Sequence, residues 1–313
     1  MARTSRKKKK NLIKAGVLAG VFLAALIGYF VWSFFNTEKE FTVYTSMEEP
    51  TLPVVYTSVY GQELNCMHGY LQDMGNEAAA DSITPLPQNR RLELRIAEYD
   101  NSITSISYEI RSLDLEHFIE STTLDEFSDS FLREDGSLRV TLPIQNLIEK
   151  DTQYLLSLHL DTGEQTINYY TRIIWTDNDN ANQMVSFARN FAEKTFDYNA
   201  ARDLTTYLET SDTEDNTDLG NVTIHSSFSQ LTWGDTDMQL ATDIEVCLKE
   251  FDGIMGAVEL KYMTTRTNEL DSTERYQVVE EYTMRMGAER IYLMDFQRKT
   301  NQIFEGSKQL FTG

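Results

Sequence analysis

The chain has 313 residues, with 49 acidic and 28 basic side chains and a formal net charge of −21 at pH 7. This acidic balance repels the phosphates of nucleic acids, which excludes a nucleic-acid-binding protein, and it favours solubility or basic partners. The only cysteines, Cys66 and Cys247, exclude a disulfide framework, although the sequence leaves open whether they are bonded to each other.

An uninterrupted apolar run at residues 15–35 follows a basic tail at residues 1–14. A helix of about 21 residues, rising about 1.5 Å per residue, spans the roughly 30 Å hydrocarbon core of a bilayer. The basic flank is expected to stay in the cytoplasm, so residues 36–313 are expected outside the membrane. Because the run ends in bulky aromatics such as Trp32 and Phe35 rather than a cleavage site, the sequence favours a retained single-pass anchor over a cleaved signal peptide.

Small residues recur every fourth position within this run, at Gly16, Gly20, Ala24 and Gly28. Such a stripe lets a second membrane helix approach closely, so it predicts homodimerisation or docking onto a membrane partner. The alternative is that these residues reflect only the ordinary abundance of Gly and Ala in membrane helices.

Seven basic residues precede the apolar run, whereas all 49 acidic residues follow it. The exported part therefore has a net charge near −28 and is large enough for two domains with hydrophobic cores.

The segment at residues 36–88 is predicted to be a stalk followed by a β-hairpin. Residues 36–50 are polar and acidic, residues 52–60 have the pattern of a strand, and residues 63–67 that of a return strand after a turn.

Short alternating segments separated by turn residues predict a β-sandwich at residues 89–176. The expected strands are residues 92–96, 103–111, 138–142, 154–160 and 167–175. The stretch 147–156 has the form of a tyrosine corner, in which Tyr154 opens the penultimate strand and bonds to nearby backbone. This segment therefore resembles a fibronectin type III or immunoglobulin-like module.

The pattern changes at residues 177–313, which predict an α+β domain. Asp177–Asn180 precedes an amphipathic helix whose apolar side includes Met184 and Phe191, and a second helix is predicted at residues 200–208. Four strands follow, at residues 240–248, 254–262, 276–286 and 290–296. Two helices on an antiparallel sheet resemble the NTF2-like and cystatin-like folds. The chain ends soon after Phe304 without a clear terminal element, which is consistent with a truncated domain in an excerpt of a longer protein.

Taken whole, the chain resembles a group of uncharacterised, N-terminally membrane-anchored extracytoplasmic proteins of Gram-positive bacteria. The stretches that carry this resemblance are Leu52–Val55, His68–Tyr70, Ile83–Leu86, Tyr108–Asp114, Tyr169–Ile173 and Arg290–Leu293. The resemblance implies a cell-envelope location but no known activity.

Glu280 is the one candidate catalytic residue. Strand alternation places it beside Val278 and Tyr282, on the face intended for the core, where a pocket carboxylate could act as a general acid or base. The competing interpretation is a bulge or edge position that releases the side chain to solvent.

Asp177 and Asp179 are the candidate metal ligands, because Asp177–Asn180 resembles the opening of a calcium loop. The rest of that motif is missing, since the turn Gly is absent and Ala188 stands where the bidentate Glu belongs. A helix N-cap explains the segment better. The histidines lie far apart and no nucleotide or dinucleotide motif occurs, so no cofactor is expected.

The sequence thus favours a membrane-anchored interaction, scaffold or sensor-like protein of the cell envelope, more consistent with binding a protein partner than with catalysis. One alternative is a cell-wall or glycan-processing accessory enzyme that uses Glu280. Another is a subunit of a membrane complex joined through the transmembrane helix.

Overall fold

The computed structural model describes residues 20, 26, 52–75, 77–125, 131–134, 136–146, 148–211, 218–268 and 272–303. The chain divides into two compact units, residues 1–47 and 48–313, and every strand described below belongs to the second. Apart from Gly20 and Leu26, the expected membrane segment 15–35 and its small-residue stripe lie outside the described residues. Among the described residues, no helix has both the length and the apolar character needed to cross a membrane.

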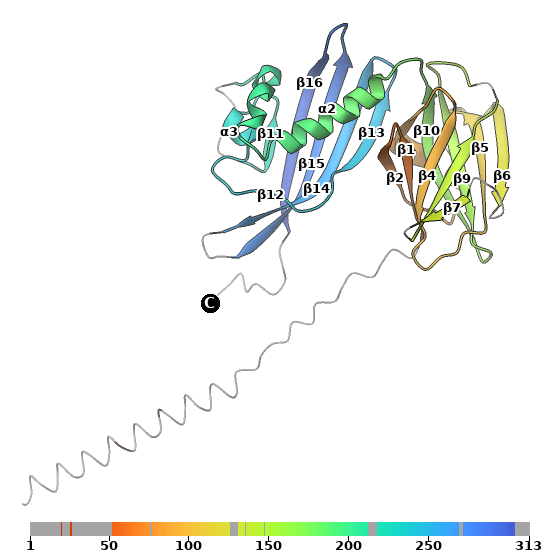
Figure 1. The fold of residues 1–313 in the computed structure, drawn as a ribbon, viewed down its shortest axis with the longest axis horizontal. Coiled ribbons are helices and arrows are strands. Elements are labelled where there is room, and N and C mark those ends of the chain that lie inside the picture. Colours follow the sequence, from red (N-terminus) through yellow and green to blue (C-terminus); the bar gives the residue numbers. More distant parts are fainter. Residues whose placement is uncertain are drawn as a thin grey trace, which may run out of the picture. The chain divides into compact units, whose positions relative to one another are not determined.

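Two five-stranded sheets form the first part of the larger unit (Figure 1). The first has the order β2-β1-β4-β8-β7, comprising β2 (Gln62–Met67), β1 (Val54–Val59), β4 (Arg91–Ala97), β8 (Ser137–Pro143) and β7 (Phe131–Glu134). The second has the order β3-β10-β9-β5-β6, comprising β3 (Ile83–Leu86), β10 (Thr166–Trp175), β9 (Gln153–Asp161), β5 (Ser105–Ser112) and β6 (Phe118–Asp125). All neighbours are antiparallel except β3 and β10.

Strand alternation builds the core of these two sheets. Along β4, for example, Leu92, Leu94 and Ile96 are buried while the residues between them are more exposed. A side-chain period of two puts one apolar row on one face of each strand, and burying that row favours a two-layer arrangement. The backbone N–H of Glu149 donates to Tyr154 Oη at 3.1 Å, which is the contact predicted for that tyrosine.

The expected boundary at residue 89 needs correction. The hairpin β1–β2 and strand β3 belong to the same two sheets, so the two-sheet part begins at Val54 and the segment 36–88 is not only a stalk and a separate hairpin. The reason is long-range pairing: β3 is parallel to β10, and no local pattern shows which distant strand will accept it.

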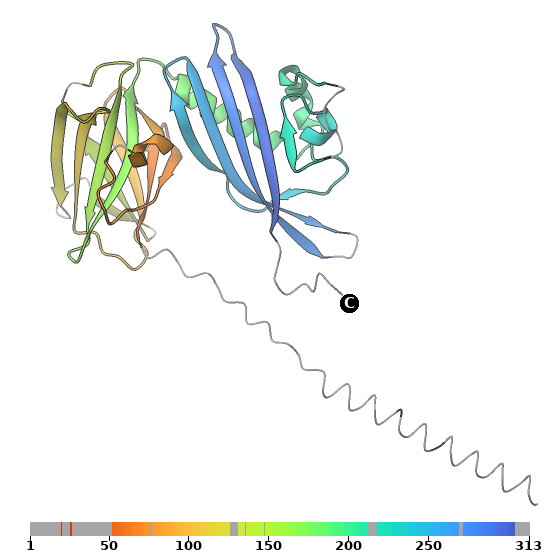
Figure 2. The ribbon, with the colours of Figure 1, turned by 180° about the vertical axis from the view of Figure 1, so that it is seen from behind.

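A six-stranded sheet follows, with the order β11-β16-β15-β14-β12 and β13 also paired to β14. Its strands are β11 (Asn221–Thr223), β16 (Ile291–Ile303), β15 (Thr273–Met286), β14 (Met255–Thr267), β12 (Gln239–Leu240) and β13 (Glu245–Phe251). Helix α2 (Asn180–Lys194) lies across one face of this sheet in Figure 1, and Figure 2 shows the opposite face.

Helix α2 packs as its apolar stripe predicts. Met184, Ala188 and Phe191 are buried, and the ring of Phe191 lies 5.2 Å from that of Phe296 in β16. The packing is close enough that a Cβ at Gly256 would meet Met184 Sδ at 2.5 Å, which accounts for a glycine at this buried position near the start of β14.

The second expected helix is a 3-10 helix, η2 (Ala200–Tyr207), rather than an α-helix. Runs of i→i+3 turns longer than about 3–4 residues are uncommon, so this eight-residue stretch is a long one of its kind. Two further short helices, η1 (Glu77–Asp81) and α3 (Phe228–Leu231), complete the described helical elements.

Candidate functional site

Glu280 lies in the interior of the third sheet, with no exposed surface. In register with Leu260 of β14 and Arg298 of β16, it sits between two neighbouring strands and not at an edge. The interpretation in which a bulge or edge position releases Glu280 to solvent is therefore wrong, and the strand alternation is right.

Three side chains surround the Glu280 carboxylate. Arg298 Nε donates to Oε1 at 2.7 Å, Tyr262 Oη donates to Oε1 at 2.9 Å and Tyr282 Oη donates to Oε2 at 2.6 Å. Arg298 also donates through Nη1 to the carbonyl of Leu231 at 2.9 Å, and its guanidinium lies 4.0 Å from the centre of the Trp233 ring. The sequence did not indicate this partner set, because its members lie on separate strands and on α3.

Burial, followed by the negative charge of Glu280, raises the pKa of both Tyr262 and Tyr282 well above the usual value, so both phenols stay protonated donors. For Arg298, burial is the largest single influence and lowers the pKa, but the charge of Glu280, the two tyrosines and the hydrogen bond to Glu280 together outweigh it, so the net direction is upward. The cluster is thus a buried ion pair supported by hydrogen bonds, with Arg298 Nη2 left without a partner among the described residues, and it holds strands β14, β15 and β16 to α3.

Asp177 and Asp179, the candidate metal ligands, make other contacts. Asp177 forms an ion pair with Lys150, and Asp179 Oδ2 accepts from Asn182 Nδ2 at 3.3 Å. Asp179 occupies the N-cap position of α2, but its side chain makes no cap hydrogen bond, so the N-cap interpretation holds for position only.

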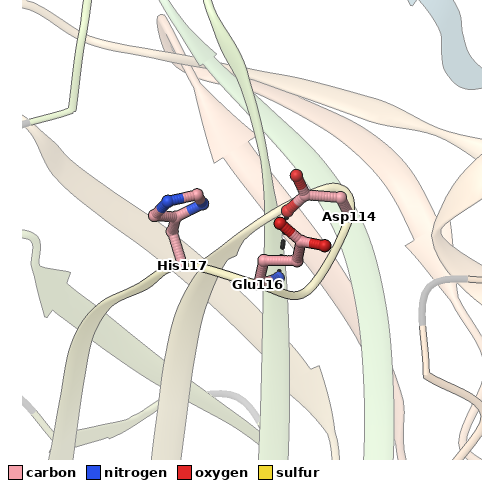
Figure 3. Close-up of side chains that lie close together, drawn as sticks. All are labelled: Asp114, Glu116 and His117. Atoms are coloured by element: carbon pink, nitrogen blue, oxygen red, sulfur yellow. Dashed lines mark hydrogen bonds between the residues drawn. The ribbon is translucent and has the colours of Figure 1, made fainter.

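A different group of possible ligands lies on the turn between β5 and β6, at Asp114, Glu116 and His117 (Figure 3). One ligand atom from each lies within 4.8 Å of the others, and all three residues are exposed. Asp114 accepts from Ser112 Oγ and from the Glu116 N–H at 3.0 Å, and these bonds, the serine's first, lower the pKa of its carboxyl. The turn is stabilised by these bonds, and exposure alone gives no support for a bound cation.

A groove of about 790 Å³ runs between the β1–β2 hairpin, α2 and the segment that leads into β13. Its walls include the residue pair Glu63 and Arg95 on one side and Arg189 of α2 on another. Arg95 donates two hydrogen bonds to Glu63, from Nε to Oε1 and from Nη2 to Oε2, the second at 2.8 Å. The Arg95 guanidinium also lies 4.1 Å from the centre of the Tyr56 ring. No local sequence signal indicated this groove, because its walls come from distant segments.

The two thiols are free. Cys66 lines the groove, and burial, followed by the charge of Glu245, raises its pKa. Burial also raises the pKa of Cys247 to about 11. Both side chains are therefore thiols and not thiolates at neutral pH, which makes them poor nucleophiles.

Polar contacts join the third sheet to the first two. The buried Asn65 side chain donates through Nδ2 to Ile83 O and Thr84 Oγ1, each at 2.9 Å, and accepts from the Leu248 N–H of β13 at 2.8 Å. Its backbone has φ 53°, a conformation that Asn tolerates better than most residues.

Arg172 of β10 makes a second link. It donates to the Lys249 carbonyl at 2.6 Å through Nη2 and to Glu250 Oε2 at 2.8 Å through Nη1. The same guanidinium bonds the Ala79 carbonyl of η1 through Nε at 3.2 Å. One side chain thus connects β10, η1 and β13.

No protein-family model matches the chain, and a search of curated proteins also finds no match.

Proposed function

We propose that this protein is a membrane-anchored, extracytoplasmic scaffold or sensor-like binding protein of the bacterial cell envelope that performs no catalysis. The single observation that supports it best is the polar link between the first two sheets and the third, through Asn65 and Arg172. Hydrogen bonds from buried or nearly buried side chains hold two β-rich parts in one arrangement, which suits a rigid binding body.

The first two sheets are proposed to form an immunoglobulin-like module. In such modules strands A, B, E and D share one sheet, and C, F and G, with C′ added in variable types, share the other. The orders β1-β4-β8-β7 and β6-β5-β9-β10 match this arrangement, with β2 and β3 as additions at one edge of each sheet. The bond between Tyr154 and the Glu149 N–H gives independent support as a tyrosine corner.

Residues 177–313 are proposed to form an NTF2-like or cystatin-like domain. The support is helix α2, which lies across a sheet whose described strand pairs are all antiparallel. The location and the likeness to anchored proteins of Gram-positive bacteria rest on the basic tail at residues 1–14 and the apolar run at residues 15–35.

The alternative enzyme, in which Glu280 acts from a pocket, loses its support because the carboxylate is completely buried and bound by three donors. A membrane-complex subunit remains a separate prediction, tested by replacing Gly20 with Leu and measuring co-purification of membrane partners. Unchanged co-purification would count against it.

Protease treatment of intact cells tests the proposal. We expect added protease to digest residues beyond Phe35, and we expect the mature chain to retain the apolar run when its mass is measured. Crosslinking in intact cells, followed by mass spectrometry, should then join residues 48–313 to a protein partner. A protected C-terminal part, or a mature chain that begins after Phe35, would exclude the proposed topology.

A further inference from the structure

We propose that the groove between the β1–β2 hairpin, α2 and the start of β13 binds an extended peptide segment of a partner protein that carries basic side chains. This inference rests on the binding function proposed above, and it assigns the site and the chemistry of the partner.

The groove has the size of a ligand site. Its volume of about 790 Å³ lies within the roughly 300–1,000 Å³ common for ligand pockets. Its walls combine polar side chains with apolar ones, among them Ile244, Met263 and Leu240, the last of which is 40% exposed. Apolar surface next to charge suits long basic side chains, whose methylene stems pack against it while the charged ends reach an acid.

The charges of the groove that are not already paired are mostly negative. Arg95 is engaged by Glu63 and Lys261 by Glu259. By contrast, the carboxylates of Glu193, Asp243 and Glu245 form no hydrogen bond or ion pair with another described residue. The unpaired charges that line the groove are thus three carboxylates and one guanidinium, that of Arg189.

The charge of one of these acids, Glu245, acts on other residues that line the groove. Burial, and next the charge of Glu245, raises the pKa of the Cys66 thiol on the opposite hairpin. For Lys261 the hydrogen bond that it donates to Glu259 is the largest cause of a raised pKa, and the charge of Glu245 adds to it. A cation entering the groove therefore meets a favourable potential, on a protein whose net charge of −21 already attracts basic partners.

Two further features favour a peptide over a small cation. Strand β2 lies at the edge of its sheet and contributes Gln62, Glu63 and Leu64 to the groove, so an extended peptide in the groove would lie beside this strand. The Nε of Arg189 is buried and has no hydrogen-bond partner among the described residues. A main-chain carbonyl of a bound peptide can supply that acceptor.

Fluorescence anisotropy on the full chain in detergent micelles tests the assignment. The probe is a fluorescein-labelled peptide of alternating Lys and Val, compared with one of alternating Glu and Val. The test variant is D243K/E245K, and the control is E164K/E289K, which makes the same charge change at exposed positions outside the groove. We expect the Lys peptide to bind the wild type with a Kd at least tenfold lower than that of the test variant, and within about threefold of the control.

A photo-crosslinking residue locates the bound peptide. Placed at Leu240 in the groove, it should capture the Lys peptide, whereas the same residue at Leu132, which is 51% exposed on β7, should not. Equal losses in both charge variants, tighter binding of the Glu peptide, or equal capture at Leu132 would each overturn the assignment. If the peptide fails to bind while crosslinking in cells still joins residues 48–313 to a partner, the groove assignment fails and the binding function stands; if both fail, both proposals are wrong.

Discussion

Glu280 and Arg298 form an ion pair in which neither side chain has any exposed surface, and Arg298 Nε lies 2.7 Å from Glu280 Oε1. They are cross-strand partners on β15 and β16, so the sheet register itself brings them together. Two charges taken from water are costly, and this cost is offset only when each finds its partner and its remaining hydrogen bonds. The two tyrosines and the Leu231 carbonyl provide such bonds, whereas Arg298 Nη2 is buried without a partner among the described residues.

Replacing Glu280 with Gln should lower the free energy of unfolding by about 3–5 kcal/mol, because Arg298 would keep a buried charge without a counter-charge. Urea denaturation of the full chain measures this loss. The control is Glu109→Gln, whose ion pair with Arg111 is 36% exposed on both sides and should contribute at most about 1 kcal/mol. Equal losses at the two positions would show that the buried pair contributes no more than a surface one.

Replacing Asn65 with Ala should loosen the link between β2 and β13. It removes the acceptor of the Leu248 N–H and the donor to Ile83 O, and each buried group left unpaired costs about 1–3 kcal/mol. Hydrogen exchange at the Leu248 amide should accelerate together with a drop in unfolding free energy. Asn199→Ala is the matched control, since that exposed residue makes no side-chain cap bond. Unchanged protection of the Leu248 amide would contradict the role assigned to Asn65.

Replacing Tyr154 with Phe should cost about 1–3 kcal/mol of stability, because the Glu149 N–H loses its acceptor while the ring stays packed. The measurement is the midpoint of urea unfolding followed by tryptophan fluorescence. Tyr99→Phe, at a position 40% exposed, should change the midpoint little. A loss at Tyr154 no larger than that at Tyr99 would remove the support that the tyrosine gives to an immunoglobulin-like module.

The carboxylate of Glu274 is expected to make the stability of the folded protein depend on pH. Its pKa is lowered from 4.5 to about 2, first by the Tyr276 hydroxyl, then by Arg266 and Asn268. The folded protein therefore prefers the ionised form, and this contribution to stability is fully present above pH 4.5 and is lost as the pH falls toward 2.

Thermal unfolding between pH 7 and pH 2 checks this dependence. The stability difference between the wild type and Glu274→Gln should shrink as the pH drops below 4.5. Glu164→Gln, in an exposed turn, is the control and should change the unfolding temperature at pH 7 little. A constant difference for Glu274→Gln would show that its carboxylate is not stabilised by folding.

Much of the local structure could be predicted from side-chain periodicity. The apolar stripe of α2, the alternation that buries Val258, Leu260 and Tyr262 in β14, and the contact of Tyr154 with nearby backbone all follow from residues close in sequence. The alternation also placed Glu280 on the buried face. A bulge or edge position that releases the carboxylate remained an open interpretation, because the arginine that neutralises it lies on another strand and no local pattern indicates it.

The sequence by itself determined the side-chain period of each strand and helix. It also determined the contrast between a basic, apolar beginning and an acidic remainder. Both are properties of neighbouring residues, because they depend only on hydrophobic spacing and charge along the chain. Only the tertiary structure decided that β3 pairs with β10, that Arg298 faces Glu280, and that Asn65 reaches Leu248. Those relationships depend on register and packing between distant segments, where many pairings satisfy the same local pattern and only the assembled core selects one.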